Sequence, residues 1–198
     1  MVRRMLRRRA VVLAAGATLL GPALPRKAWA AGPDGGLSRL REHAAPQPLP
    51  EGLSFTDVEG RATDFAAFRG RGLVVNFWAT WCPPCVAEMP ALDRAHAALA
   101  RDGIEVLALS SDRGGRTQVE PFYARTGLRN LAMWFDPRGA TGRALGVRGL
   151  PTTLILDRAG REVARLEGEA EWDRPEMLAA IRRLARGGWR RASRGGPI

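Results

Sequence analysis

Two cysteines, Cys82 and Cys85, are the residues of this chain whose type and spacing point most directly to chemistry. They are the only cysteines in the sequence, and they form a C-x-x-C pair. Such a pair at the start of a helix is typical of a redox centre, because the unpaired backbone amides there favour a thiolate at the first cysteine. The second cysteine follows one helical turn later, within reach of a disulfide. The spacing therefore predicts a pair that alternates between dithiol and disulfide, with Cys82 as the nucleophile.

Other roles for two cysteines need partners that the sequence supplies poorly. A zinc site needs further ligands, but His43 lies in a predicted linker and His96 lies further along the cysteine helix. A purely structural disulfide over so short a loop removes little entropy from the unfolded chain. A peroxidase does not need a second cysteine at this spacing. The rival from another class is a copper(I)-binding or chaperone module, because copper(I) favours thiolates, but no Met or His completes such a site.

The elements around the pair form a strand, a helix and a second strand. Residues 73–78 are an apolar run typical of a strand buried on both faces. Residues 83–100 carry apolar side chains at helical spacing, and residues 104–109 are a second buried strand. Pro83 and Pro84 suit the first turn of the helix, where a missing amide hydrogen costs nothing. The cysteines thus lie where the first strand passes into the helix.

The rest of the chain predicts one layered α/β sheet. Strands are expected at residues 53–58 and 62–65, at 131–135, and at 152–156 and 162–166; helices are expected at 118–126, 140–145 and 174–185. Asp173 is the expected N-cap of the last helix, with Glu176 as its capping-box partner. The order combines a parallel crossover with antiparallel hairpins, so we expect a mixed sheet.

Several spaced motifs together resemble one known family. Residues 74–90 read VVNFWATWCPPCVAEMP, and residues 146–153 read GVRGLPTT. These segments resemble the TlpA/ResA/CcmG branch of the thioredoxin superfamily, and residues 168–172 resemble TlpA in particular. The resemblance covers about residues 53–186 and implies a thioredoxin fold over residues 51–186, with a central mixed β-sheet, flanking helices and an added N-terminal β-hairpin. It also makes Leu150–Pro151 the expected cis peptide bond.

The resemblance assigns roles to residues around the cysteines. Glu88 matches an acid that the family carries three residues after the second cysteine, and its spacing from Cys85 places both on one helix face. We expect Glu88 to be partly buried and to raise the pKa of Cys85. Trp78 is expected to pack in the core, and Trp172 to be a packing or surface residue. The residues expected to meet the client protein are Trp81, Pro83, Pro84, Leu150 and Pro151.

The function implied is dithiol-disulfide exchange with client proteins that carry paired cysteines. The clients suggested by the family are an apocytochrome c, a copper-delivery protein or an oxidase subunit. Electrons would come from a membrane thiol reductant of the CcdA/DsbD kind. No cofactor and no metal are expected, and the direction of electron flow cannot be inferred from two intervening prolines.

The N-terminal thirty residues have the order of an export signal. Arginines precede an apolar stretch at residues 10–24, and Ala28-Trp29-Ala30 is a candidate cleavage site. The Arg8-Arg9 pair also fits a twin-arginine signal. We expect a periplasmic protein cleaved after Ala30, with an uncleaved membrane anchor as the alternative. Residues 31–50 are interpreted as a linker, and residues 187–198 as a disordered basic tail.

The net charge of +11 would by itself suggest a nucleic-acid-binding protein. The positive charge, however, is concentrated at the two ends of the chain. Residues 31–181 hold 18 Arg against 20 Asp and Glu, a balance of −2. Because a nucleic-acid-binding module carries basic side chains on its folded surface, we expect no nucleic-acid partner.

Overall fold

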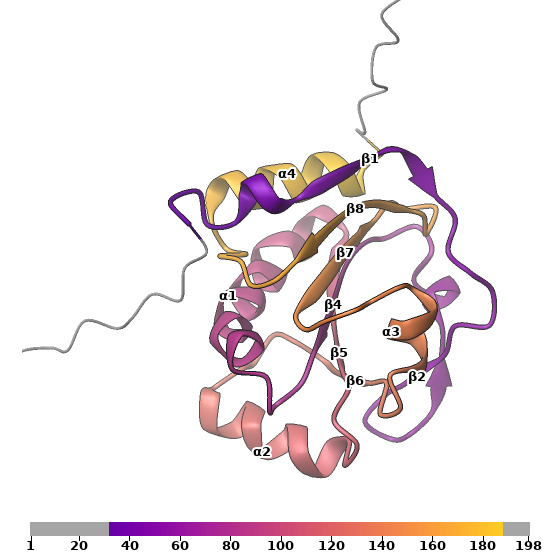
Figure 1. The fold of residues 1–198 in the computed structure, drawn as a ribbon, viewed down its shortest axis with the longest axis vertical. Coiled ribbons are helices and arrows are strands. Elements are labelled where there is room, and N and C mark those ends of the chain that lie inside the picture. The colour runs from indigo at the N-terminus through magenta and orange to yellow at the C-terminus, as the bar shows by residue number, and fades with distance from the viewer. Residues whose placement is uncertain (1–31, 188–198) are drawn as a thin grey trace, which may run out of the picture.

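The computed structural model describes residues 32–187, which form an eight-stranded sheet with helices on both faces (Figure 1). The strand order is β1-β8-β7-β4-β5-β6-β2-β3. The strands are β1 (Arg41–Gln47), β2 (Phe55–Thr56), β3 (Ala62–Thr63), β4 (Gly72–Trp78), β5 (Ile104–Ser110), β6 (Met133–Phe135), β7 (Thr152–Leu156) and β8 (Glu162–Glu167). The α-helices are α1 (Pro83–Leu99), α2 (Arg116–Thr126), α3 (Ala140–Ala144) and α4 (Pro175–Ala185), and the 3-10 helices are η1 (Leu37–Arg39), η2 (Phe65–Phe68) and η3 (Ala100–Asp102). The predicted mixed α/β sheet is confirmed.

Strand β4 is the centre of the sheet. All of its residues are buried. It pairs in parallel with β5 and antiparallel with β7, so it has no free edge. This explains the nearly continuous apolar run in its sequence, since both faces are covered. The chain leaves β4 at Trp78 and enters α1 four residues later at Cys82, the N-cap of that helix.

Alternate side chains of β4 supply two separate apolar clusters. Val74 and Trp78 belong to the cluster beneath α1, α2 and α4, where Trp78 is fully buried as expected. Leu73, Val75 and Phe77 belong to the cluster on the opposite face, beneath η2 and α3. The two-residue period of a strand produces this division. The sheet is therefore packed on both sides and gives α1 a rigid base.

The added hairpin lies at the far edge of the sheet. Strands β2 and β3 pair antiparallel, with Phe55 opposite Thr63. Thr56 pairs with Phe135 of β6, which attaches the hairpin to the main sheet. Each strand is two residues long, shorter than the sequence predicted, because the connecting segments turn away outside this short ladder.

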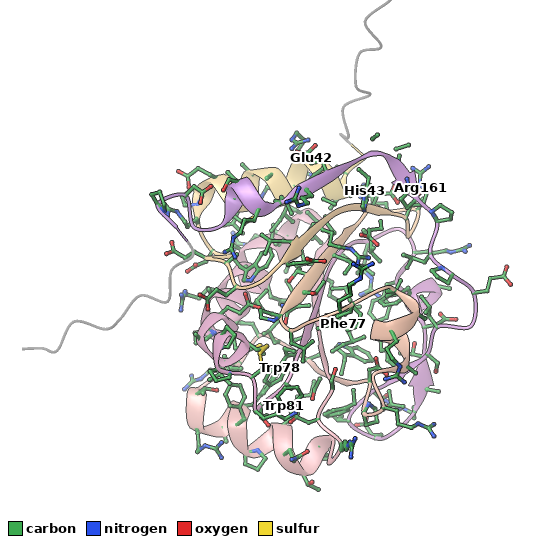
Figure 2. The ribbon with its side chains drawn as sticks, in the orientation of Figure 1. Glu42, His43, Phe77, Trp78, Trp81 and Arg161 are labelled. Atoms are coloured by element: carbon green, nitrogen blue, oxygen red, sulfur yellow. A yellow bond between two sulfur atoms is a disulfide. The ribbon has the colours of Figure 1, made fainter. Side chains whose placement is uncertain are left out.

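The segment interpreted as a linker is largely structured, so this expectation was wrong. Residues 32–40 contain η1, and β1 pairs antiparallel with β8, with Arg41 opposite Arg165 and Glu42 opposite Ala164. His43 Nε2 lies 2.8 Å from Glu162 Oε1, and Glu42 forms an ion pair with Arg183 of α4. Figure 2 shows Glu42 and His43 on this strand.

The physical reason for this difference is the position of β1. As an edge strand it has no buried residue, so its sequence lacks the alternation of apolar and polar residues that marks a half-buried strand. Backbone hydrogen bonds and charged side chains hold it in place instead. These depend on partners more than a hundred residues away, which composition does not reveal.

The predicted capping box of the last helix is also wrong. Helix α4 begins at Pro175, and its N-cap is Arg174, which makes no side-chain capping bond. The residue before a proline favours an extended backbone, which fixes the boundary at Arg174. The carboxylate of Asp173 instead accepts a hydrogen bond of 2.6 Å from Arg94 Nε on α1. Asp173 therefore joins two helices rather than capping one.

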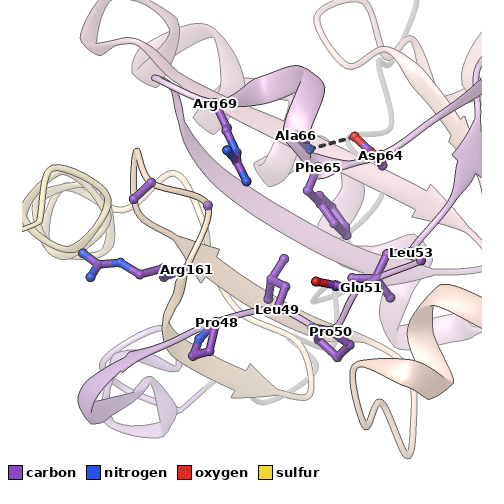
Figure 3. Close-up of a pocket in the computed structure, with 13 residues that line it drawn as sticks. Pro48, Leu49, Pro50, Glu51, Leu53, Asp64, Phe65, Ala66, Arg69 and Arg161 are labelled. Atoms are coloured by element: carbon purple, nitrogen blue, oxygen red, sulfur yellow. Dashed lines mark hydrogen bonds between the residues drawn. The ribbon is translucent and has the colours of Figure 1, made fainter.

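A hollow of about 340 Å³ lies between the segment after β1 and η2 (Figure 3). Pro48, Leu49 and Phe65 are among its lining residues. Asp64 at its edge caps η2 by accepting a hydrogen bond of 2.8 Å from the Ala66 amide. No cysteine and no predicted site residue lines this hollow.

The expected signal peptide and basic tail lie largely outside the described residues. Within residues 32–187, no helix is both long and apolar enough to cross a bilayer. The export route and the alternative of an uncleaved anchor thus stay predictions.

Candidate active site

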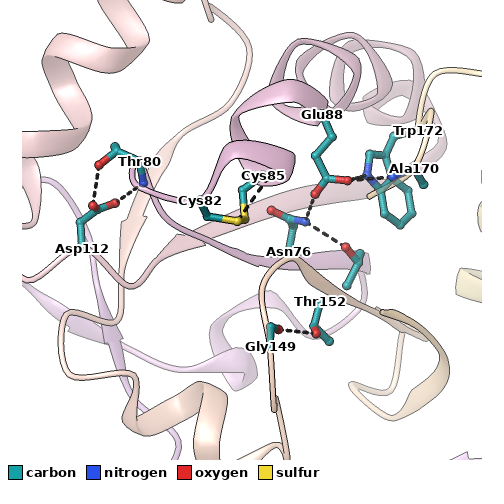
Figure 4. Close-up of a disulfide and its surroundings, with 11 residues drawn as sticks. Asn76, Thr80, Cys82, Cys85, Glu88, Asp112, Gly149, Thr152, Ala170 and Trp172 are labelled. Carbon is teal, nitrogen blue, oxygen red and sulfur yellow. Dashed lines mark hydrogen bonds between the residues drawn. A yellow bond between two sulfur atoms is a disulfide. The ribbon is translucent and has the colours of Figure 1, made fainter. Parts of the chain in front are cut away.

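Cys82 and Cys85 form a disulfide at the N-terminus of α1 (Figure 4). Cys82 is the N-cap residue, and its Sγ accepts a hydrogen bond of 3.4 Å from the Cys85 amide. Cys82 retains 5% of its surface, whereas Cys85 is completely buried. The helix thus presents Cys82 outward with the Cys85 amide hydrogen at its sulfur, and keeps Cys85 behind it. This asymmetry suits an attacking cysteine and a resolving cysteine.

The connection from β4 to the cysteines is held by a buried carboxylate. Asp112, which is fully buried, accepts hydrogen bonds from the Thr80 amide (2.9 Å) and the Thr80 hydroxyl (2.6 Å). The Ser110 hydroxyl lies 2.8 Å from the same carboxylate. These bonds fix the chain two residues before Cys82. Sequence reasoning did not identify Asp112, which lies on the loop after β5 and is distant in sequence.

Glu88 is buried one turn beyond Cys85 and is 4% exposed. Its Oε2 accepts hydrogen bonds from the Trp172 indole (2.7 Å) and the Ala170 amide (3.0 Å), and its Oε1 accepts one from Asn76 Nδ2 (2.8 Å). Burial raises the pKa of Glu88 to about 7, and the three donated hydrogen bonds oppose that rise. The side chain therefore titrates near neutral pH while it is held rigidly inside the protein.

Asn76 connects Glu88 to strand β7. Its Nδ2 also lies 2.9 Å from Thr153 Oγ1, while its Oδ1 has no partner among the described residues. Sequence reasoning missed Asn76, although an amide inside the apolar run 73–78 is a signal, because a buried polar group needs a partner. Trp172 was expected to be a packing or surface residue. It is fully buried as expected of packing, but it also donates to Glu88.

The loop before β7 has the expected cis bond between Leu150 and Pro151. The Pro151 carbonyl accepts a hydrogen bond of 2.8 Å from the Gly168 amide. The Thr152 hydroxyl donates one of 2.8 Å to the Gly149 carbonyl. These bonds hold the loop that lines the groove with Cys82, and Figure 4 shows the one between Thr152 and Gly149.

A groove of about 570 Å³ opens beside Cys82. Besides Cys82, it brings together four of the five residues expected to meet a client: Trp81, Pro83, Pro84 and Leu150. Trp81 is 66% exposed, the one large apolar side chain of residues 32–187 that is exposed, and it lies near the disulfide in Figure 2. Pro151, Cys85 and Glu88 do not line the groove and lie behind it. The groove therefore reaches the outer cysteine alone.

The predicted site carries no metal-binding cluster. Within residues 32–187, no group of three His, Cys, Asp or Glu side chains converges as metal ligands would. His43 pairs with Glu162, and His96 Nδ1 accepts a hydrogen bond of 3.2 Å from the Val106 amide. Both histidines are thus engaged away from the cysteines.

The fold and this site define a thioredoxin-fold protein with a C-x-x-C pair at the start of its first α-helix. A family model named Redoxin matches residues 44–181, and the chain belongs to the redoxin family. Within the thioredoxin superfamily it is TlpA/ResA/CcmG-like, as its motifs implied.

Curated relatives carry the name thiol-disulfide oxidoreductase ResA. The protein from Bacillus thuringiensis subsp. konkukian is 32% identical over 114 residues, covering 58% of this chain and 65% of the relative. The protein from Geobacillus thermodenitrificans is 36% identical over 106 residues, covering 54% of this chain and 60% of the relative. The match thus spans less than two thirds of these relatives.

Solved structures share the fold. A putative thiol:disulfide interchange protein DsbE from Chlorobium tepidum is 26% identical, with a TM-score of 0.57, over 70% of this chain and 93% of that one. A secreted thiol-disulfide isomerase from Corynebacterium glutamicum is 25% identical, with a TM-score of 0.61, over 76% and 95%. An exposed lipoprotein thioredoxin from Streptococcus pneumoniae is 26% identical, with a TM-score of 0.56, over 66% and 98%.

Proposed function

We propose that this protein is an extracytoplasmic thiol-disulfide oxidoreductase that reduces disulfide bonds in client proteins. The observation that carries the proposal is the asymmetry of the pair: Cys82 opens into a groove, and Cys85 is buried directly behind it. A disulfide that served only structure would need neither the groove nor the difference in exposure. The ResA relatives support the same activity.

The reaction follows from this geometry. In the reduced protein the Cys82 thiolate attacks one sulfur of a client disulfide, which forms a mixed disulfide and releases the other client sulfur as a thiolate. The Cys85 thiolate then attacks Cys82 Sγ, which forms the Cys82–Cys85 disulfide and releases the second client thiolate. Two electrons pass from the protein to the client, and the two client sulfurs take up protons. An external dithiol must return two electrons before the next cycle.

Glu88 is the group best placed to manage the proton of Cys85. It follows Cys85 by three residues on the same helix, and a carboxylate with a pKa of about 7 accepts and returns a proton readily near neutral pH. A negative charge at Glu88 also disfavours a second negative charge on Cys85, which keeps the inner thiol protonated until it attacks. Asn76 and Trp172 act as positioning residues, because they hold the carboxylate in place.

The client chain docks in the groove against Trp81, Pro83, Pro84 and Leu150. We propose that the backbone beside Pro151 lies along the client as an added strand would, with the Cys82 sulfur at its centre. Trp81 supplies apolar contact area at the rim.

The location and the clients belong to the same proposal. The likeness to a secreted isomerase and to an exposed lipoprotein supports a site of action outside the cytoplasm, as does the predicted signal at residues 1–30. The family resemblance supports an apocytochrome c, a copper-delivery protein or an oxidase subunit as the client. A membrane thiol reductant of the CcdA/DsbD kind would supply the electrons.

Client trapping tests the proposal directly. In a Cys85→Ala variant the mixed disulfide on Cys82 cannot be resolved, so clients should accumulate as adducts that reducing agents release. Mass spectrometry would identify them, and a Cys82→Ser/Cys85→Ala variant is the matched control. The wild-type protein should also catalyse insulin reduction by a dithiol. Stoichiometric copper(I) binding without catalysed reduction would contradict the proposal and favour a copper-binding module.

A further inference from the structure

The groove beside Cys82 continues into a second hollow of about 630 Å³, and the two carry a concentration of arginines. They share Ser111, Gly139 and Arg143 as lining residues, which makes them one continuous surface. We call it the arginine groove, after four of its lining residues: Arg113, Arg138, Arg143 and Arg148. No Asp or Glu lines either part.

The positive charge of the arginine groove is not balanced by the protein itself. All four arginines are exposed, and none forms an ion pair with a carboxylate of residues 32–187. Many other arginines are paired in this way, as Arg61 is with Asp57 and Arg165 with Glu162. Because residues 31–181 have a net charge of −2, the excess of positive charge is local to the groove.

The acidic residues adjacent in sequence do not neutralise the groove. Asp112 precedes Arg113, but it is fully buried and its carboxylate accepts hydrogen bonds from Thr80 and Ser110. Asp136 is 3% exposed and accepts a hydrogen bond of 2.9 Å from the Gly142 amide. Both carboxylates are directed into the protein, while the arginine side chains reach solvent.

The groove also has a defined apolar part at the cysteine. Trp81 and Leu150 line it beside Cys82, and the Arg143 guanidinium is positioned by a hydrogen bond of 2.6 Å to the Arg138 carbonyl. A chain that places its cysteine against Cys82 therefore has apolar contacts next to that cysteine and cationic contacts further along the same groove. Exposed charges of this kind accelerate the encounter with an oppositely charged partner more than they increase final affinity.

We propose that the arginine groove selects client segments in which acidic side chains flank the reactive cysteine. The occupant is an extended stretch of a client protein, with Asp or Glu directed at Arg143, Arg148 and their neighbours. This inference rests on the proposed thiol-disulfide exchange and adds to it the charge class of the substrate.

The test uses three short peptides, each joined through one cysteine to a chromogenic thiol. They differ only in the residues that flank the cysteine, which are Asp, Asn or Lys. In a single turnover, the reduced wild-type protein should cleave the Asp peptide with a second-order rate constant about tenfold higher than that for the Asn peptide at low salt, and the Lys peptide most slowly. High salt should bring the three rates together, since exposed charges are screened.

Variants show whether the groove causes the preference. In Arg143→Gln/Arg148→Gln the ratio of the Asp to the Asn rate should fall toward one, and Arg143→Glu/Arg148→Glu should favour the Lys peptide. The matched control is Arg101→Gln/Arg158→Gln, which removes the same charge from exposed positions; Arg101 lies at the opposite end of α1 from Cys82. This control should keep the full preference.

Two results would overturn the inference. Equal cleavage of the three peptides by the wild-type protein at low salt would show that flanking charge is not recognised. If the control variant loses the preference for the Asp peptide as fully as Arg143→Gln/Arg148→Gln does, the preference comes from the net charge of the protein rather than from the groove. Failure to cleave any peptide would instead contradict the proposed function itself, so the two failures are distinguishable.

Discussion

The indole Nε1 of Trp172 donates a hydrogen bond of 2.7 Å to Oε2 of Glu88, and both side chains are buried. Trp172 lies just before α4, and Glu88 lies on α1, so the bond joins the end of the domain to the cysteine helix. Because one carboxylate oxygen also accepts from the Ala170 amide, the position of Glu88 depends on this distant segment. The proton affinity near Cys85 is thus set partly by the C-terminal third of the chain.

Replacing Trp172 with Phe should raise the pKa of Glu88 above its value of about 7. The variant keeps an aromatic ring but removes one of the donors that stabilise the carboxylate. Stability at pH 8 should fall by about 1–3 kcal/mol, the usual cost of a lost partner for a buried polar group. Carboxyl NMR titration and urea unfolding measure the two effects. Trp134→Phe is the control, because its Nε1 has no partner among the described residues; an unchanged Glu88 pKa in Trp172→Phe would contradict the prediction.

The stability of the protein should fall as pH rises from about 4.5 to 7 because of Glu88. The folded protein binds this proton more tightly than the unfolded chain does, since the pKa is raised from 4.5 to about 7. Stability then decreases with pH through that window, by about 3 kcal/mol in total, and is constant above it. In Glu88→Gln this decrease should be absent. Urea midpoints between pH 4.5 and 8 test the difference, and parallel curves for both proteins would count against it.

The same Glu88→Gln variant should change the chemistry of the inner cysteine. Without the negative charge, the pKa of Cys85 should fall, and resolution of the mixed disulfide should slow because no carboxylate accepts the thiol proton. The fold should tolerate the change, because the new amide can meet the unpartnered Asn76 Oδ1 if the Asn76 amide rotates. Thiol titration and stopped-flow kinetics measure both effects. Glu120→Gln, an exposed acid on α2, is the control; identical Cys85 titration curves in wild type and Glu88→Gln would refute this role.

In the reduced protein, Cys82 should react with iodoacetamide at pH 6 at least about tenfold faster than Cys85. Cys82 keeps some exposure and lies at the helix N-terminus, where backbone amides favour its thiolate, whereas Cys85 is fully buried. Peptide mass spectrometry after timed quenching measures the two rates. A urea-unfolded sample should show similar rates for both. Similar rates in the folded protein would reject the assignment of Cys82 as the nucleophile.

The sequence predicted the elements that depend on local pattern. Strand β4, helix α1 and the cysteines at the start of that helix follow from a nearly continuous apolar run, helical spacing and a motif within seventeen residues. The cis bond at Leu150–Pro151 followed from the family resemblance, since general frequencies favour trans. These features are encoded by neighbouring residues, so they could be inferred without knowledge of the tertiary contacts.

The features that sequence reasoning missed depend on contacts between distant segments. Asn76 and Trp172 acquire their roles only when β4, α1 and the segment before α4 meet around Glu88. The four arginines of the arginine groove come from three separate loops and from helix α3, and only the fold places them together beside Cys82. Asp173 fits a local capping rule, but Arg94 on another helix binds it.

The pairing of β1 with β8 also determines how the protein can be shortened. A fragment beginning at residue 51, where the domain was expected to start, would expose the outer edge of β8, the edge that faces away from β7, where β1 pairs with residues 162–165. Long bare strands of this kind recruit strands from other molecules and lead to aggregation. The opposite edge of the sheet ends in β3, which is only two residues long and offers little template. Residues 41–47 therefore cover this edge of β8, and a fragment without them is expected to aggregate more readily than the full chain.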